Sequence, residues 1–234
     1  MAVQLSKGDK TALIIGASGL VGSFCLEQLL LSPNYARVLS FGRRKLPIKN
    51  AKLQQYIIDF DQPQQYTAYF QGDDFYCCLG TTIKKAGSQE AFQKVDYTYI
   101  YELAKIAAHN KVNQFLLVSA IGADPNSLIF YNRVKGKTEE AIRNLPFWAV
   151  HIFRPSVLLG QRNENRWGER AASIIGKGID YFTGGLLGKY SPVEGEVVAK
   201  AMLNAAQRLE GGIHTYYYKQ MEPLANPRQL DSPS

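Results

Sequence analysis

A serine, a tyrosine and a lysine stand close together in the middle of the chain. Ser119 ends an apolar run, and Tyr131 and Lys135 follow it, four residues apart from each other. Residues i and i+4 share one face of a helix, so these two side chains are expected to lie together. A nearby ammonium favours the phenolate and lowers a tyrosine pKa that is otherwise about 10. Such a tyrosine can exchange a proton with a carbonyl or alcohol oxygen, and Ser119 can hydrogen-bond that oxygen.

A glycine-rich turn near the N-terminus is suited to a nucleotide pyrophosphate. It has the spacing G-x-x-G-x-x-G and lies between a short apolar run and a helical pattern. Glycines let the backbone approach phosphates, and a helix N-terminus presents free N–H groups to them. The spacing differs from the commoner G-x-G-x-x-G, so the turn alone does not identify a dinucleotide site. The expected pyrophosphate residues are Gly16, Ala17, Ser18, Gly19, Leu20 and Val21.

The end of the second predicted strand indicates which nucleotide would bind. NAD sites usually carry an Asp or Glu there, about 20 residues after the turn, on the ribose 2′-hydroxyl. This strand ends instead in Arg43 and Arg44. A guanidinium can pair with a 2′-phosphate, so we expect NADP(H), with Arg43 on the phosphate and Arg44 flanking the adenine. The alternative is a solvated surface pair. Asp59 and Phe60, after the third strand, are expected at the adenine edge.

Short apolar runs alternate with helical patterns through the first two thirds of the chain. The runs show little strict alternation, which is typical of strands buried on both faces of a parallel sheet. The predicted strands are Ala12–Ile15, Arg37–Phe41, Leu53–Ile58, Asp74–Cys78, Phe115–Ser119 and Trp148–Phe153. The predicted helices are Leu20–Leu31, Gln89–Asn110 and Tyr131–Asn144. This order predicts an α/β fold with a doubly wound, mostly parallel sheet of the Rossmann type, and Lys135 would lie on the third of these helices.

The alternation of apolar runs and helical patterns is less regular in the last third of the chain. Residues 161–190 are rich in glycine and polar residues, with one short helix expected over residues 167–175. A helix is predicted over Glu194–Arg208 and a last strand over Ile213–Lys219. We expect one domain, residues 1–234, in which residues 155–225 form a small substrate-side extension. Three arginines four residues apart could hold an acidic substrate or form a solvated face: Arg162, Arg166 and Arg170.

Length and composition limit the classes of protein to which this chain can belong. The 234 residues, 46% of them hydrophobic, suit one well-buried globular domain. The sequence contains no run of about 18 apolar residues, so no membrane span is expected. From the polar N-terminus we expect a cytosolic protein. The three cysteines and the three widely separated histidines predict neither a disulfide framework nor a metal site.

The net charge of +7 permits nucleic acid, anionic lipid or a phosphorylated ligand as partner. The basic residues are scattered, and no long basic run is present. An anionic cofactor accounts for part of the charge more economically, so nucleic acid is not an expected partner.

Further strings, taken with the turn and the Ser119, Tyr131 and Lys135 set, resemble the short-chain dehydrogenase/reductase family. The G-x-x-G-x-x-G turn and the short length look like its atypical branch, and the resemblance runs from about residue 10 to residue 219. Within that branch the strings look like the subgroup that contains the Tat-interacting-protein oxidoreductase and its bacterial relatives. The strings are Cys77-Cys78-Leu79-Gly80-Thr81-Thr82, Val95-Asp96, Ser119-x-x-Gly122-Ala123-Asp124, Tyr131-x-x-x-Lys135-Gly136 and Phe153-Arg154-Pro155.

The resemblance implies NADP binding and a catalytic set of Ser119, Tyr131 and Lys135, in which Lys135 also holds the cofactor ribose. It implies that Leu79, Gly80 and Thr81 line that ribose and that Pro155, Ser156 and Val157 lie beside the nicotinamide. One position departs from the family pattern. Many family enzymes use an asparagine of the fourth helix in a proton relay, and the nearest residue here is Asp96, which has a different donor pattern.

We therefore expect an NADP(H)-dependent oxidoreductase that transfers hydride to or from a small-molecule carbonyl or alcohol, with Tyr131 as acid and base. The alternative is a regulatory protein that binds NADPH with little turnover. The presence of serine, tyrosine and lysine together favours the enzyme. Neither a membrane nor a nucleic acid is an expected partner, and the sequence leaves monomer and homodimer open.

Overall fold

Seven parallel strands form one sheet in the computed structural model, which describes residues 8–156, 158–159 and 193–226. The sheet has the order β3-β2-β1-β4-β5-β6-β9, which reverses between β1 and β4. Ligands of open α/β sheets bind at such a switch point, at the carboxyl ends of the strands. The predicted doubly wound Rossmann-type sheet is confirmed. Its strands are β1 (Lys10–Ile15), β2 (Tyr35–Gly42), β3 (Leu53–Ile57), β4 (Asp74–Cys77), β5 (Gln114–Val118), β6 (Ala149–Phe153) and β9 (Gly212–Tyr216).

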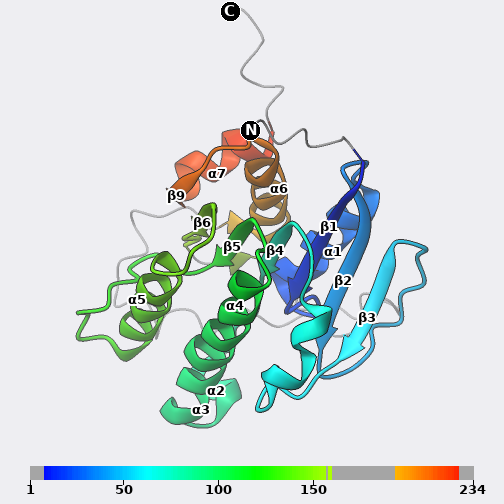
Figure 1. Cartoon of the computed structure of the whole chain (residues 1–234). Coiled ribbons are helices and arrows are strands. Elements are labelled where there is room, and N and C mark those ends of the chain that lie inside the picture. Colours follow the sequence, from blue (N-terminus) through cyan, green and yellow to red (C-terminus); the bar gives the residue numbers. More distant parts are fainter. Residues whose placement is uncertain (1–7, 157, 160–192, 227–234) are drawn as a thin grey trace, which may run out of the picture.

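Helices cover both faces of this sheet (Figure 1). On one face lie α1 (Leu20–Leu31), α6 (Gly195–Gln207) and α7 (Tyr218–Ala225), and on the other lie α4 (Ile100–His109) and α5 (Phe130–Arg143). Successive strand residues enter the two cores in turn. Ile14 and Tyr76 pack on the α1 and α6 side, whereas Leu13 and Phe75 pack on the α4 side.

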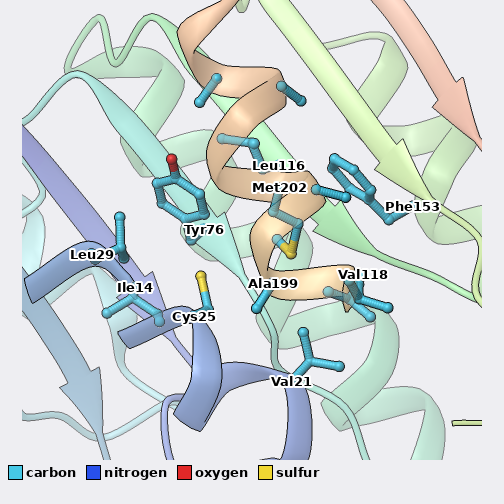
Figure 2. Close-up of a cluster of buried hydrophobic side chains, with 14 of the residues drawn as sticks. Ile14, Val21, Cys25, Leu29, Tyr76, Leu116, Val118, Phe153, Ala199 and Met202 are labelled. Atoms are coloured by element: carbon cyan, nitrogen blue, oxygen red, sulfur yellow. The ribbon is translucent and has the colours of Figure 1, made fainter. Parts of the chain in front are cut away.

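The predicted C-terminal helix lies close to its expected position as α6. Figure 2 shows Met202 and Ala199 of α6 beside Leu116, Val118 and Phe153 of the central strands. All five side chains are buried. This packing attaches the C-terminal part of the chain to the same sheet that carries the glycine turn.

The helix predicted over residues 89–110 is not uniform. It consists of α3 (Gln89–Gln93), a π-helical segment η2 (Lys94–Tyr99) and α4, and a short α2 (Ile83–Ala86) precedes it. Each π turn holds an extra residue, and such segments often mark functional sites. Here the π-helical segment carries Asp96, which is fully buried. A 3₁₀-helix, η1 (Pro63–Tyr69), connects β3 to β4.

The C-terminal strand is shorter than predicted. The strand expected over residues 213–219 ends at Tyr216, and α7 begins at Tyr218. The backbone N–H of Tyr217 donates to Gln220 Oε1 at 2.9 Å, which forms part of a capping box that starts α7. A consecutive run of tyrosines favours a strand, and this local capping overrides that preference.

A second, two-stranded sheet pairs β7 (Leu158–Leu159) with β8 (Val193–Glu194). The short helix expected over residues 167–175 and the arginines at 162, 166 and 170 lie outside the described residues. Within the described ranges, no helix is long and apolar enough to cross a membrane. The same ranges contain no group of three or more His, Cys, Asp or Glu placed to hold a metal.

Candidate active site

The glycine turn between β1 and α1 has a geometry that only glycine permits at two positions. Gly16 has φ +76°, and a Cβ added to it would lie 2.4 Å from the backbone carbonyl carbon of Cys78. A Cβ on Gly22 would lie 2.1 Å from the Gly16 carbonyl oxygen. Gly19 occupies the N-cap of α1, which has no side-chain cap and no acidic residue in its first turn. The turn therefore fits a phosphate group, with helix N–H groups available to it.

Two arginines follow β2 at the same edge of the sheet. Arg43 and Arg44 are exposed and form no hydrogen bond or ion pair with the described part of the chain. Asp59 follows β3 and accepts bonds from Asp61 N at 2.9 Å and Gln62 Nε2 at 3.3 Å. Phe60 is buried, with its ring 5.3 Å from that of Tyr99. The arginines are thus open to an anion, whereas Phe60 belongs to the packed core.

The first turns of α5 carry the predicted proton-exchanging pair. The ring of Tyr131 lies 5.4 Å from that of Phe92, and Lys135 lies one turn further along the helix and is buried. A Cβ on Gly136 would lie 2.1 Å from the backbone carbonyl carbon of Asp124. Gly136 therefore lets the loop after β5 pack directly against α5, which brings the end of β5 to this helix.

Lys135 forms a buried ion pair that the sequence did not reveal. Its Nζ lies 2.8 Å from Asp96 Oδ1, and the other Asp96 oxygen, Oδ2, accepts the Thr81 backbone N–H at 2.8 Å. Burial alone would lower the pKa of Lys135. The Asp96 carboxylate and Tyr131 raise that pKa, and the opposing effects together outweigh burial, so the pKa of Lys135 is raised and the ammonium stays charged.

This ion pair connects α5 to the loop after β4. Within the predicted ribose-lining segment Leu79, Gly80 and Thr81, a Cβ on Gly80 would lie 3.6 Å from Lys135 Nζ. The segment that the family resemblance places at the ribose thus lies beside the predicted lysine. The structure brings these predicted residues together.

Ser119 is held by a second buried network. Its Oγ donates to Glu139 Oε1 at 2.6 Å. Arg154 donates to both oxygens of Glu139, from Nε at 2.9 Å and from Nη2 at 2.6 Å, and its Nη1 donates to Tyr217 Oη at 2.8 Å. Glu139 lies four residues after Lys135 on the same helix, and this spacing was the available signal for it.

The residues expected beside the nicotinamide follow β6. The Pro155 carbonyl accepts the Ile121 N–H at 2.9 Å, which holds this segment against the loop after β5. Ser156 is half-buried, and Val157 lies outside the described residues.

These residues all follow the carboxyl ends of the strands. They provide an anion-binding turn, two open guanidinium groups, a charged lysine and a tyrosine hydroxyl that can exchange a proton. Such a set has the donors to hold an anionic nucleotide and a hydroxyl that can exchange a proton with a bound oxygen.

Similar proteins were found by sequence, although no family profile matches the chain. Protein HTATIP2 of Rattus norvegicus is 36% identical over 201 residues, which cover 84% of this chain and 81% of the relative. Protein FMP52-1, mitochondrial, of Scheffersomyces stipitis is 34% identical and covers 84% and 88% of the two chains. Protein FMP52, mitochondrial, of Candida albicans is 32% identical and covers 85% and 88%.

Solved structures share the fold at low identity. MoeE5 in complex with UDP-glucose and NAD has a TM-score of 0.66 and 14% identity, over 88% of this chain and 75% of that one. The enzyme WbmH of Bordetella bronchiseptica in complex with NAD⁺ has a TM-score of 0.66 and 16% identity, over 97% and 83%. The chain therefore has the fold of these NAD-binding Rossmann proteins.

One expectation is contradicted by these comparisons. The sequence led us to expect a cytosolic protein, but the FMP52 relatives are named mitochondrial. The expectation rested on a polar N-terminus, and that feature does not distinguish the cytosol from an organelle.

Proposed function

The chain belongs to the family of HTATIP2 and FMP52, an atypical branch of the short-chain dehydrogenases/reductases, and on this premise we propose that it is an NADP(H)-dependent oxidoreductase. The observation that carries the proposal is the Lys135 ammonium, kept charged by Asp96 one helical turn from Tyr131. The proposed substrate is a small molecule with a carbonyl or an alcohol. In one domain of residues 1–234, residues 155–225 would form the substrate side.

Tyr131 is the proposed acid and base. In reduction its hydroxyl gives a proton to the carbonyl oxygen, and in oxidation the phenolate removes one from the alcohol. The nicotinamide of a bound cofactor would supply or accept the hydride at the adjacent carbon. The positive charge of Lys135 stabilises the phenolate when the proton has left. An ammonium has three donors, so Lys135 can bond to Asp96 and still bond to ribose hydroxyls.

Ser119 completes the proposed catalytic set. While its hydrogen is donated to Glu139, its oxygen can only accept, for example from a substrate hydroxyl. To donate to a carbonyl oxygen the hydroxyl must rotate away from Glu139, whose carboxylate then remains paired with Arg154. The network thus permits this rotation without leaving an unpaired buried charge.

NADP(H) rather than NAD(H) is supported by the end of β2. Arg43 and Arg44 stand without a partner among the described residues, and no acid occupies the place where NAD sites hold the 2′-hydroxyl. The proposed roles are those expected from the sequence, with Arg43 on the 2′-phosphate, Arg44 flanking the adenine and Asp59 at the adenine edge.

A regulatory protein that binds NADPH with little turnover is the second candidate. The bond of Ser119 to Glu139 favours it, because that bond withholds the serine hydrogen from a substrate.

Calorimetric titration with NADPH and NADH at fixed salt, followed by a screen of carbonyl substrates, tests both candidates. Tight NADPH binding with turnover supports the enzyme, and tight binding without turnover supports the regulatory protein. Binding of neither nucleotide would overturn both.

A further inference from the structure

Asp96 is the residue nearest to the place where many family enzymes carry a relay asparagine, and its surroundings show what the carboxylate contacts. Oδ1 lies 2.8 Å from Lys135 Nζ, and Oδ2 accepts the Thr81 N–H at 2.8 Å. The Asp96 carbonyl oxygen accepts a bond from Thr138 Oγ1, also at 2.8 Å. Asp96 therefore joins three separate elements, the loop after β4, the π-helical segment and α5.

Both carboxylate oxygens of Asp96 face donors. An asparagine would have to turn its NH₂ group toward either the Lys135 ammonium or the Thr81 N–H, and neither can accept a bond. The side chain is fully buried, so water cannot replace the lost bond. At this position the amide is therefore not a substitute for the carboxylate, although it is nearly the same shape.

We propose that Asp96 is a positioning residue for the cofactor site, which holds the Lys135 ammonium and the Gly80–Thr81 backbone in one fixed arrangement. This rests on the proposed function. Because Lys135 and Thr81 are both predicted to border the ribose, loss of the carboxylate would displace two sides of that site together.

The chain contains a matched control for this proposal. Lys10 Nζ lies 3.1 Å from Asp74 Oδ2, and both side chains are buried. The two Asp74 oxygens also face donors, with Tyr35 Oη donating to Oδ2 and Gln114 Nε2 to Oδ1. This second pair lies at the amino ends of the strands, away from the proposed cofactor site.

The test compares Asp96→Asn with Asp74→Asn in the full chain. Both should lower the midpoint of urea unfolding, since each leaves a buried lysine without its counter-ion. Only Asp96→Asn should also weaken NADPH binding measured by calorimetry, by about tenfold or more. NADPH affinity equal to that of the unchanged protein in Asp96→Asn would overturn the proposal, and so would an equal loss of affinity in both variants.

Unfolding also tests the pair without any cofactor. If Asp96 holds Lys135, the double variant Asp96→Asn, Lys135→Met should unfold at a higher urea concentration than Asp96→Asn alone, because it no longer buries an unpaired ammonium. A double variant that unfolds at no higher urea concentration than Asp96→Asn alone would overturn the proposal. If the unchanged protein binds no NADPH, the proposed function fails, and this comparison alone decides the role of Asp96.

Discussion

Ser119 Oγ lies 2.6 Å from Glu139 Oε1. Arg154 also binds the Glu139 carboxylate, through two of its nitrogens. This relationship joins the end of β5, the middle of α5 and the end of β6. The side chain of Glu139 is 2% exposed, so the hydrogen bonds within this network are its main compensation for the loss of water. A residue proposed for catalysis is thus part of the structural core.

Glu139→Gln should destabilise the fold strongly. The substitution removes a buried negative charge that the partly buried Arg154 binds through two nitrogens, and a hydrogen bond to a charged group is worth about 1.5–3 kcal/mol. Urea unfolding followed by circular dichroism measures the change. The matched control is Glu140→Gln, at the exposed neighbouring position, which should change the free energy of unfolding by less than about 0.5 kcal/mol. Equal stability of the two variants would show that the network contributes nothing.

Tyr131→Phe should abolish reduction while leaving NADPH bound. The substitution removes only the hydroxyl that gives the proton, and general acid catalysis contributes about 10²–10⁴-fold to a rate. The Phe92 ring contact is retained by phenylalanine, so the fold should not change. Steady-state rates with a carbonyl substrate measure the loss of reduction. Calorimetry with NADPH measures whether the cofactor still binds. Turnover at the unchanged rate would exclude Tyr131 as the acid.

Arg43→Ala should weaken NADPH binding far more than NADH binding. A charge-assisted hydrogen bond is worth about 1.5–3 kcal/mol, which corresponds to about 10- to 100-fold in the dissociation constant. The control Arg208→Ala removes the same charge after α6, close to the amino ends of the strands. An equal loss for NADPH and NADH in Arg43→Ala would refute the role on the 2′-phosphate.

The parts of the fold that the sequence predicted are those governed by local pattern. Buried strands such as β4 and β5 are apolar runs after one polar first residue. The four-residue spacing of Tyr131 and Lys135 placed them one turn apart on α5. The glycine turn was predictable for the same reason, because the glycines themselves carry the signal.

The features that the sequence missed depend on tertiary contacts. The π-helical segment places Asp96 against Lys135, which lies 39 positions further along the chain by residue number, and no local pattern encodes that pair. Likewise the spacing of Glu139 from Lys135 places it on the same face of α5, but its bond to Ser119 forms only when β5 and α5 pack together. The start of α7 at Tyr218 was missed because a capping box outweighed the strand preference of three tyrosines.

His151 provides a prediction about pH. Gln114 Nε2 donates to Asp74 Oδ1 and the Ala206 carbonyl, so Gln114 Oε1 accepts from His151 Nε2, 3.1 Å away. His151 Nδ1 then accepts from Tyr216 Oη, also at 3.1 Å. The ring is therefore neutral. Burial, with a smaller contribution from His214, lowers its pKa from 6.5 to about 4.

The protein should accordingly lose stability as the pH falls from about 6.5 to about 4. The unfolded chain binds a proton to His151 in this range and the folded chain does not, so the stabilisation present above pH 6.5 disappears, by roughly 3 kcal/mol in all. Asp74, whose pKa is raised by burial, acts in the opposite direction, so variants must be compared with one another. Unfolding free energies between pH 7 and pH 5 should depend less on pH in His151→Gln than in the unchanged protein. His109→Gln, at an exposed position, should keep the full dependence, and an identical slope in all three proteins would show that His151 titrates normally.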